Sequence, residues 1–74
     1  MDSVEFEIVS SNGMSVNFKV RRTLLMGKVY EAYEGRQGIA GCVLLYKGTV
    51  IEHNHTPDSL NFPRQGKIVV NCMY

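Results

Sequence analysis

Two histidines are spaced in a way that could serve metal chemistry. His53 and His55 are separated by one residue, so in an extended segment both imidazole rings would project to the same side. A zinc site needs further nitrogen or sulfur ligands, and no other histidine or cysteine lies nearby along the chain. We interpret the pair as histidines of a solvated loop, and the sequence predicts no metal site.

The cysteines are the other candidates for chemistry. Cys42 and Cys72 are the only two in the chain, and their spacing matches no metal-binding motif. No recognisable motif supplies a base that would activate either thiol as a nucleophile. We therefore expect reduced thiols, as in cytosolic or nuclear proteins, and neither enzymatic activity nor a cofactor.

A group of basic residues raises the possibility of nucleic-acid binding. The group consists of Lys19, Arg21, Arg22, Lys28 and Arg36. Modules that bind single strands interleave exposed aromatic residues with basic ones, and here only Phe18 does so. We therefore expect no nucleic-acid partner, although a steep salt dependence of oligonucleotide binding would argue for one.

Length and composition point to one small globular domain spanning residues 1–74. Hydrophobic residues make up 45% of the 74 residues and charged residues 20%, and the formal net charge is +1. No apolar stretch approaches the ~20 residues of a membrane helix, and the acidic N-terminal residues do not resemble a signal peptide. We expect a nuclear or cytoplasmic protein without a membrane partner. A domain of this size has a thin core, so it suits surface recognition better than a catalytic cleft.

The first half of the chain predicts a β-hairpin. Residues 4–9 and 14–21 alternate apolar and polar side chains with a period of two, which is typical of half-buried strands. Between them, Asn12-Gly13 tolerates the positive φ angles of a tight turn.

The next segment, residues 23–37, carries apolar residues at helical spacing. Thr23 is predicted to cap its start, and Gly38 to take the left-handed conformation after its end. Gly27 and Gly35 each cost roughly 1 kcal/mol relative to alanine inside a helix. Packing on a sheet must therefore stabilise this helix.

The second half predicts short strands at residues 42–46, 49–51 and 67–72. Residues 56–60 predict a single turn capped by Thr56, with Pro57 in the first helical position. A helix that crosses back over the sheet would let the first and last strands pair in parallel at its centre. The second strand would then be an edge, with unpaired backbone groups that could accept an extended peptide.

The residues also match the order and spacing of a known family. At the second strand and helix the chain carries Phe18-Lys19-Val20-Arg21-Arg22, Lys28, Ala32-Tyr33 and Arg36-Gln37-Gly38. Further along it carries Gly48, Ile51, Asn54-His55-Thr56-Pro57, Leu60, Ile68 and Val70. Over residues 4–70 the chain thus resembles SUMO proteins. The resemblance implies an α+β, ubiquitin-like β-grasp fold, a mixed sheet of four to five strands packed on one helix.

The resemblance also implies a binding groove between the second strand and the helix. In the family, this groove accepts an extended Val/Ile-rich motif with an acidic flank, so the partners would be proteins that carry such motifs. The matching apolar positions are Val16, Phe18, Val20, Val29 and Ala32, and the basic surround is Lys19, Arg21, Lys28 and Arg36. Without the resemblance, the apolar positions could equally be core, and the charges a guard against edge-to-edge aggregation.

The chain departs from the family at three places. It carries no Gly-Gly after its last strand, where SUMO proteins carry the tail that is conjugated to lysine. Pro63-Arg64-Gln65-Gly66 replaces an acidic stretch that contacts the conjugating enzyme, and Lys47 replaces an acidic residue, which weakens the expectation of that partner. Two functions stay open: a SUMO-like interaction module, and a conjugatable modifier whose tail lies beyond this sequence.

Overall fold

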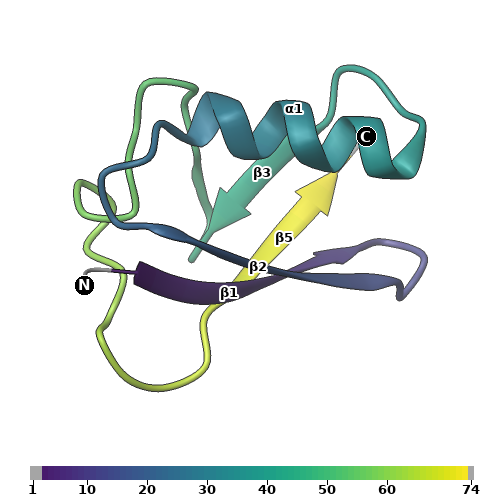
Figure 1. The fold of residues 1–74 in the computed structure, drawn as a ribbon. Helices are drawn as coiled ribbons and strands as arrows, with labels where there is room; N and C mark the ends of the chain where they lie inside the picture. The colour runs from purple at the N-terminus through teal and green to yellow at the C-terminus, as the bar shows by residue number, and fades with distance from the viewer. Residues whose placement is uncertain (1–2, 74) are drawn as a thin grey trace.

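The computed structural model describes residues 3–73, so the predicted domain limits at 1 and 74 lie outside the described residues. The elements follow the predicted order of hairpin, helix, two strands and last strand (Figure 1). They are β1 (Ser3–Ser10), β2 (Ser15–Arg21), α1 (Met26–Gln37), β3 (Val43–Tyr46), β4 (Thr49–Val50) and β5 (Val69–Met73).

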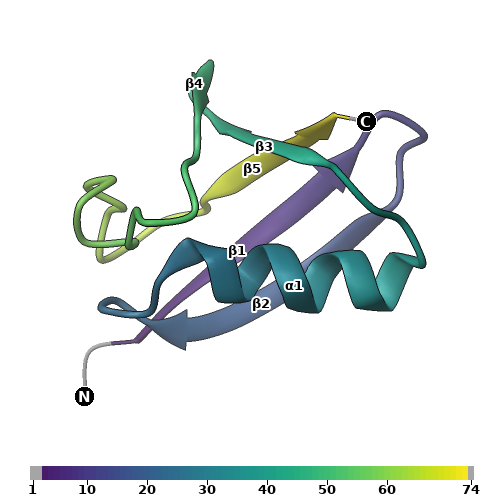
Figure 2. The ribbon, with the colours of Figure 1, turned by 90° about the horizontal axis from the view of Figure 1, so that it is seen from above.

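The strands form one mixed sheet with the order β2-β1-β5-β3-β4. β1 and β5 pair in parallel, whereas the β1–β2, β3–β5 and β3–β4 pairs are antiparallel. The predicted central parallel pair and the edge position of β2 are therefore confirmed. Figure 2 shows α1 running back over this sheet after β2 and leading into β3, and β5 lies between β1 and β3.

The core lies between α1 and the covered face of the sheet. Its helical part is the stripe Met26, Val29, Tyr30 and Tyr33. The alternating residues Val4, Phe6 and Ile8 of β1 and Val70 and Cys72 of β5 supply the sheet side. Each fully buried apolar side chain of this kind stabilises the fold by roughly 1.5–3 kcal/mol. The packing thus stabilises a helix that contains two glycines.

The start of α1 differs from the sequence prediction. The helix begins at Met26 after Leu25, whose side chain makes no capping hydrogen bond. The N–H of Leu24 donates to the carbonyl of Arg21 at 3.0 Å, so Thr23 lies in the turn that leaves β2. The prediction that Thr23 caps the helix is therefore wrong, because this turn uses the residues that a longer helix would need.

Backbone carbonyls from a distant loop replace the missing cap. The N–H groups of Met26 and Gly27 donate to the carbonyls of His55 and His53 at 2.7 and 2.9 Å. A Cβ atom on Gly27 would lie 3.2 Å from the carbonyl oxygen of His53, so this approach favours glycine. The ring of His53 stacks on Tyr30 with a centroid distance of 4.3 Å. The two histidines therefore help to hold the start of α1.

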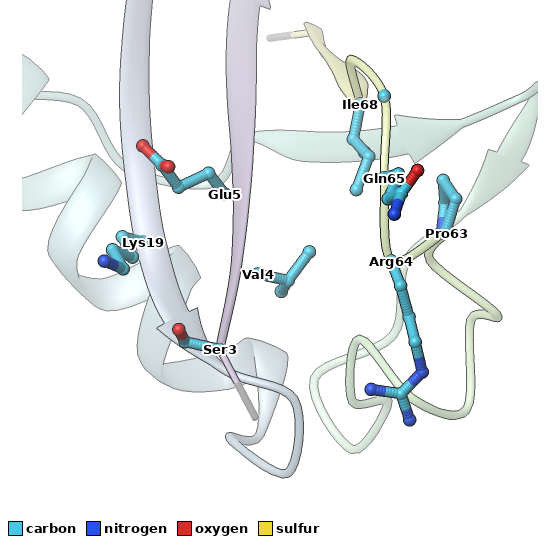
Figure 3. Close-up of a pocket in the computed structure, with 9 residues that line it drawn as sticks. Ser3, Val4, Glu5, Lys19, Pro63, Arg64, Gln65 and Ile68 are labelled. Atoms are coloured by element: carbon cyan, nitrogen blue, oxygen red, sulfur yellow. The ribbon is translucent and has the colours of Figure 1, made fainter. Parts of the chain in front are cut away.

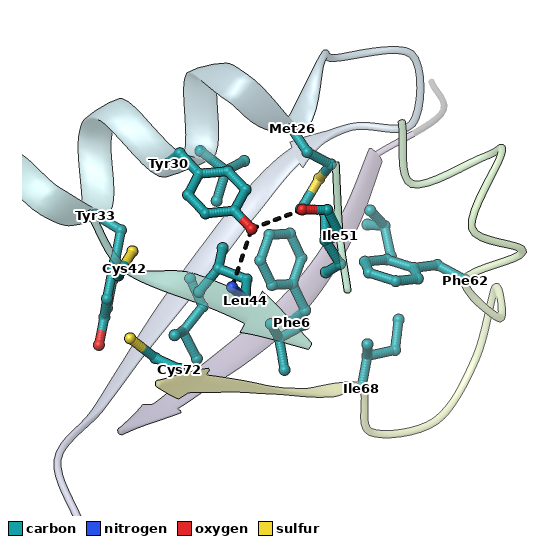
Figure 4. Packing of buried hydrophobic residues seen from close by; sticks show 14 residues of the cluster. Phe6, Met26, Tyr30, Tyr33, Cys42, Leu44, Ile51, Phe62, Ile68 and Cys72 are labelled. Atoms are coloured by element: carbon teal, nitrogen blue, oxygen red, sulfur yellow. Dashed lines mark hydrogen bonds between the residues drawn. The ribbon is translucent and has the colours of Figure 1, made fainter. Parts of the chain in front are cut away.

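Two buried polar side chains connect the irregular segment after β4 to the rest of the fold. The Tyr30 hydroxyl accepts a hydrogen bond from the N–H of Leu44 at 3.0 Å and donates to the carbonyl of Ile51 at 2.6 Å (Figure 4). Arg22, 6% exposed, donates to the Asp58 carboxylate at 3.0 Å and to the carbonyl of Phe62 at 2.6 Å. Both side chains join elements that are far apart in sequence.

The predicted turn after residue 55 is present. The N–H of Ser59 donates to the Thr56 hydroxyl at 3.0 Å, and the N–H of Leu60 donates to the Thr56 carbonyl at 3.0 Å. Pro57 is buried under this turn. Gly13 and Gly38 have positive φ angles of 86° and 66°, as their predicted turn and helix-end roles require.

Both cysteines are free and buried. The Cys42 thiol lies 3.5 Å from a carboxylate oxygen of Glu34. Burial first, and then the neighbouring Cys72, raises the pKa of the Cys42 thiol from 9.0 to about 12. The thiolate needed for nucleophilic chemistry is therefore disfavoured at neutral pH.

Replacing Tyr30 by phenylalanine should lower the free energy of unfolding by about 1–3 kcal/mol, because the buried N–H of Leu44 loses its acceptor. Urea denaturation measures this change. Tyr46→Phe is the matched control, since the Tyr46 hydroxyl makes no hydrogen bond with the described residues. Equal losses in the two variants would contradict the role given to Tyr30.

Stability should decrease in alkaline solution. The folded chain holds the Cys42 proton more tightly than the unfolded chain does, because the pKa is 9.0 when exposed and about 12 when buried. This contribution is complete below pH 9 and declines as the pH rises from about 9 to 12, by up to ~1.4 kcal/mol per pH unit. The raised pKa of Tyr30 acts in the same direction.

Unfolding free energies of the unmodified chain and of Cys42→Ala at about pH 8 and pH 10 measure the Cys42 contribution. The unmodified chain should lose about 1 kcal/mol more than the variant between the two values. Parallel losses would show that Cys42 titrates normally in the folded state.

Candidate functional site

The outer edge of β2 carries unpaired backbone groups. The N–H of Ser10 donates to the carbonyl of Met14 at 2.9 Å, and the register pairs Phe6 with Phe18. Hydrogen-bonded pairs alternate along antiparallel strands, so the even-numbered residues of β2 bond to β1. The odd-numbered residues direct their backbone groups away from the sheet: Ser15, Asn17, Lys19 and Arg21. An added strand could pair with this edge.

A row of apolar side chains lies beside this edge on the face that α1 covers. Val16, Phe18 and Val20 are half-buried and pack against the core. The Phe18 ring stacks on Phe6 at 5.8 Å and is tilted against Tyr33 of α1 at 6.4 Å. The row therefore reaches from the edge strand to the helix, and Phe18 serves the core as well as the surface.

The helix contributes to the predicted groove unequally. Val29 is only 1% exposed and belongs to the core, so it lies beneath the surface and offers almost no area to a ligand. Ala32, Lys28 and Arg36 are exposed on α1. Ala32 is therefore exposed on α1, the β2 row is half-buried against the core, and Val29 lies within the core.

The basic side chains occupy both ends of this region. Lys19 and Arg21 are exposed near the C-terminal end of β2, and the period of two that turns Val16, Phe18 and Val20 toward α1 directs these two side chains to the other face of the sheet. Because α1 runs back along β2, Lys28 in the first turn of the helix lies at that same end, and Arg36 in the last turn lies at the other end (Figure 2). Positive charge is therefore concentrated toward Arg21.

Arg22 does not belong to this basic surface. Its guanidinium is buried against Asp58 and Phe62, so the prediction that groups it with the surface cations is wrong. The alternation of β2 contained the signal for this placement. Continued from Val20, a period of two puts residue 22 on the covered face. The exposed basic residues of this group are therefore Lys19, Arg21, Lys28 and Arg36.

A separate hollow of about 320 Å³ lies between β1 and the segment before β5 (Figure 3). Ser3, Glu5 and Lys19 form one side, and Arg64 and Gln65 project from the other. This is the segment in which Pro63-Arg64-Gln65-Gly66 replaces the acidic stretch of SUMO proteins. The lining carries both charge signs and little apolar character, which does not suit an apolar ligand.

Residues 3–73 contain neither a cluster of metal ligands nor a membrane-spanning helix. Among residues 3–73, no group of three or more His, Cys, Asp or Glu side chains is arranged to hold a metal ion. No helix within this range has the length and apolar character to cross a membrane. The β2–α1 region combines an outer strand edge with a half-buried apolar row.

Comparison with known protein families supports the resemblance seen in the sequence. A family model described as "Ubiquitin-2 like Rad60 SUMO-like" (Rad60-SLD) matches residues 5–69 of the chain. The matched residues run from β1 into β5 and include all of β2 and α1. The domains of this family are of the interaction or modifier type, and the family is not a catalytic one. The chain therefore belongs to the Rad60 SUMO-like family of ubiquitin-like domains, with an α+β β-grasp fold.

Proposed function

We propose that residues 1–74 act as one SUMO-like protein-interaction module and catalyse no reaction. The module binds short Val/Ile-rich segments with an acidic flank, which add a strand to β2 in the groove beside α1. The observation that carries this proposal is the open edge of β2 next to the half-buried row Val16, Phe18 and Val20. We place the module in the nucleus or cytoplasm, where its partners carry such motifs.

Strand addition and side-chain contacts have different tasks in this proposal. Backbone hydrogen bonds to Ser15, Asn17 and Lys19 hold an extended segment but select little between sequences. Phe18 and Ala32 supply the selectivity: the Val and Ile side chains of the segment would pack between them, and this space favours β-branched residues. The contact is small and the segment is ordered on binding, so affinity should be roughly micromolar.

The distribution of charge gives the bound segment an orientation. Lys19, Arg21 and Lys28 lie toward the C-terminal end of β2, whereas Arg36 alone lies toward the other end. An acidic flank is therefore placed beside Arg21. Solvated charge pairs of this kind contribute little energy singly, but together they set orientation and association rate.

A conjugatable SUMO-type modifier is the alternative function. It would need a Gly-Gly tail following residue 74 in the full-length protein, which the complete sequence would reveal. Contact with the conjugating enzyme is a weaker part of the proposal, since Arg64 and Lys47 replace acidic residues of the family there.

Titration with an acidic Val/Ile-rich peptide tests the groove. Backbone amide shifts of the isotope-labelled chain should cluster on residues 16–22 and on α1 around Ala32, because these groups would contact the added strand. Shifts confined to the Pro63–Gly66 loop, or no shifts at millimolar peptide, would contradict the proposal.

Neutralising Lys19 should weaken binding of that peptide. Lys19→Gln removes one charge near the acidic flank, and the dissociation constant should rise about two- to fivefold. Lys67→Gln is the matched control, because Lys67 is exposed, pairs with Glu7 at 3.5 Å and makes the same change in net charge. If both variants weaken binding equally, long-range attraction and not a local contact explains the effect.

A further inference from the structure

A second hollow lies at the sheet edge opposite β2. It occupies about 370 Å³ between the β3–β4 turn and the turn that starts at Thr56. Its lining consists of Tyr46, Lys47, Thr49, His55, Ser59 and Leu60. β4 and β2 are the two outer strands of the sheet, so this hollow is separate from the surface proposed at β2 and α1.

Lys47 has an unfavourable backbone conformation at the rim of this hollow. Tyr46 pairs with Thr49, which leaves Lys47 and Gly48 as a two-residue hairpin loop with φ angles of 51° and 80°. Two positive φ angles define a type I′ turn, in which asparagine or glycine is favoured at the first position. A lysine held in this conformation suggests that its side chain has a role beyond the turn.

The Lys47 ammonium group is available to a ligand. It lies 5.4 Å from the centroid of the Tyr46 ring, and it forms no ion pair with a described residue. The nearby His55 ring accepts the Glu52 N–H at Nδ1, with a distance of 2.9 Å, so its own proton lies on Nε2, where it can donate. No carboxylate lines the hollow. The polar rim therefore favours an anionic group.

The floor of the hollow is apolar and rigid. Tyr46 and Leu60 are half-buried and pack against the core, and the Tyr46 ring meets Phe62 edge-on at 4.7 Å. The opposite wall is fixed by two hydrogen bonds: Thr56 N–H donates to the Ser59 hydroxyl at 2.8 Å, and Ser59 N–H donates to the Thr56 hydroxyl at 3.0 Å. A ligand would lose little affinity to ordering this site.

We propose that this hollow is a second recognition site, for a protein segment in which an aspartate or glutamate adjoins a leucine-sized side chain. The carboxylate meets Lys47 and the Nε2–H of His55, and the aliphatic group lies on Tyr46 and Leu60. Charge complementarity selects the acidic residue, and the apolar floor selects its neighbour. The proposal does not depend on the function given to the β2–α1 groove.

Two capped tetrapeptides, acetyl-Asp-Leu-Asp-Leu-amide and acetyl-Lys-Leu-Lys-Leu-amide, serve as probes in an amide-shift titration of the isotope-labelled chain. The acidic peptide should shift residues 46–49 and 58–60 in a saturable way, and the basic peptide should bind more weakly there. Lys47→Glu keeps a β-carbon in the same strained turn and reverses the charge. It should invert this preference, changing the ratio of dissociation constants by about tenfold or more.

Lys47→Asn distinguishes the role of the lysine side chain in binding from the role of residue 47 in the turn. Asparagine suits the type I′ conformation, so the melting temperature should not fall, whereas affinity for the acidic peptide should drop about threefold. Lys19→Gln should leave the shifts at residues 46–60 unchanged, which distinguishes this site from the groove. Equal shifts by both peptides, unchanged affinity of Lys47→Asn, or no shifts at these residues would overturn the proposal.

Discussion

One helix has to cover one face of a five-stranded sheet, and the contact between the α1 stripe and the central β1–β5 pair is the interaction on which the fold depends. A chain of 74 residues has little else to bury. Irregular segments therefore contribute Ile51, Phe62 and Ile68 to the same core. Within residues 3–73, β2 and β4 are the two outer strands of the sheet, and both proposed recognition surfaces lie beside them.

The long segment between β4 and β5 is held in place by polar groups as well as by apolar contacts. The Tyr30 hydroxyl fixes its start at Ile51, the guanidinium of Arg22 fixes it at Asp58 and Phe62, and the carbonyls of His53 and His55 receive the first N–H groups of α1. These bonds satisfy buried donors that would otherwise destabilise the fold. They also keep the Thr56 turn in a defined position beside β3.

The two surfaces use the same sheet in different ways. At β2 the outer backbone edge is unpaired, so in our proposal recognition begins with strand pairing, and the apolar row beside α1 adds selectivity. At the β3–β4 turn Tyr46 and Thr49 pair with each other in the hairpin. Recognition in the hollow beside this turn would therefore depend on the side chains that line it. The two proposed surfaces thus lie at the two opposite edges of one sheet.

The sequence by itself determined the elements whose causes are local. Periods of two and of three to four residues located β1, β2 and α1, the expected crossover of the helix placed β2 at an edge, and the family pattern identified the β-grasp fold. Tertiary structure alone decided what depends on distant partners. The His53–His55 loop caps α1 in place of Thr23, and core packing removes Val29 from the surface, while the carbonyl of Phe62 holds the buried guanidinium of Arg22. The left-handed conformation of Lys47 follows from the β3–β4 register. A local pattern specifies the face of the strand or helix on which a side chain lies, but only the folded chain determines which residues that side chain contacts.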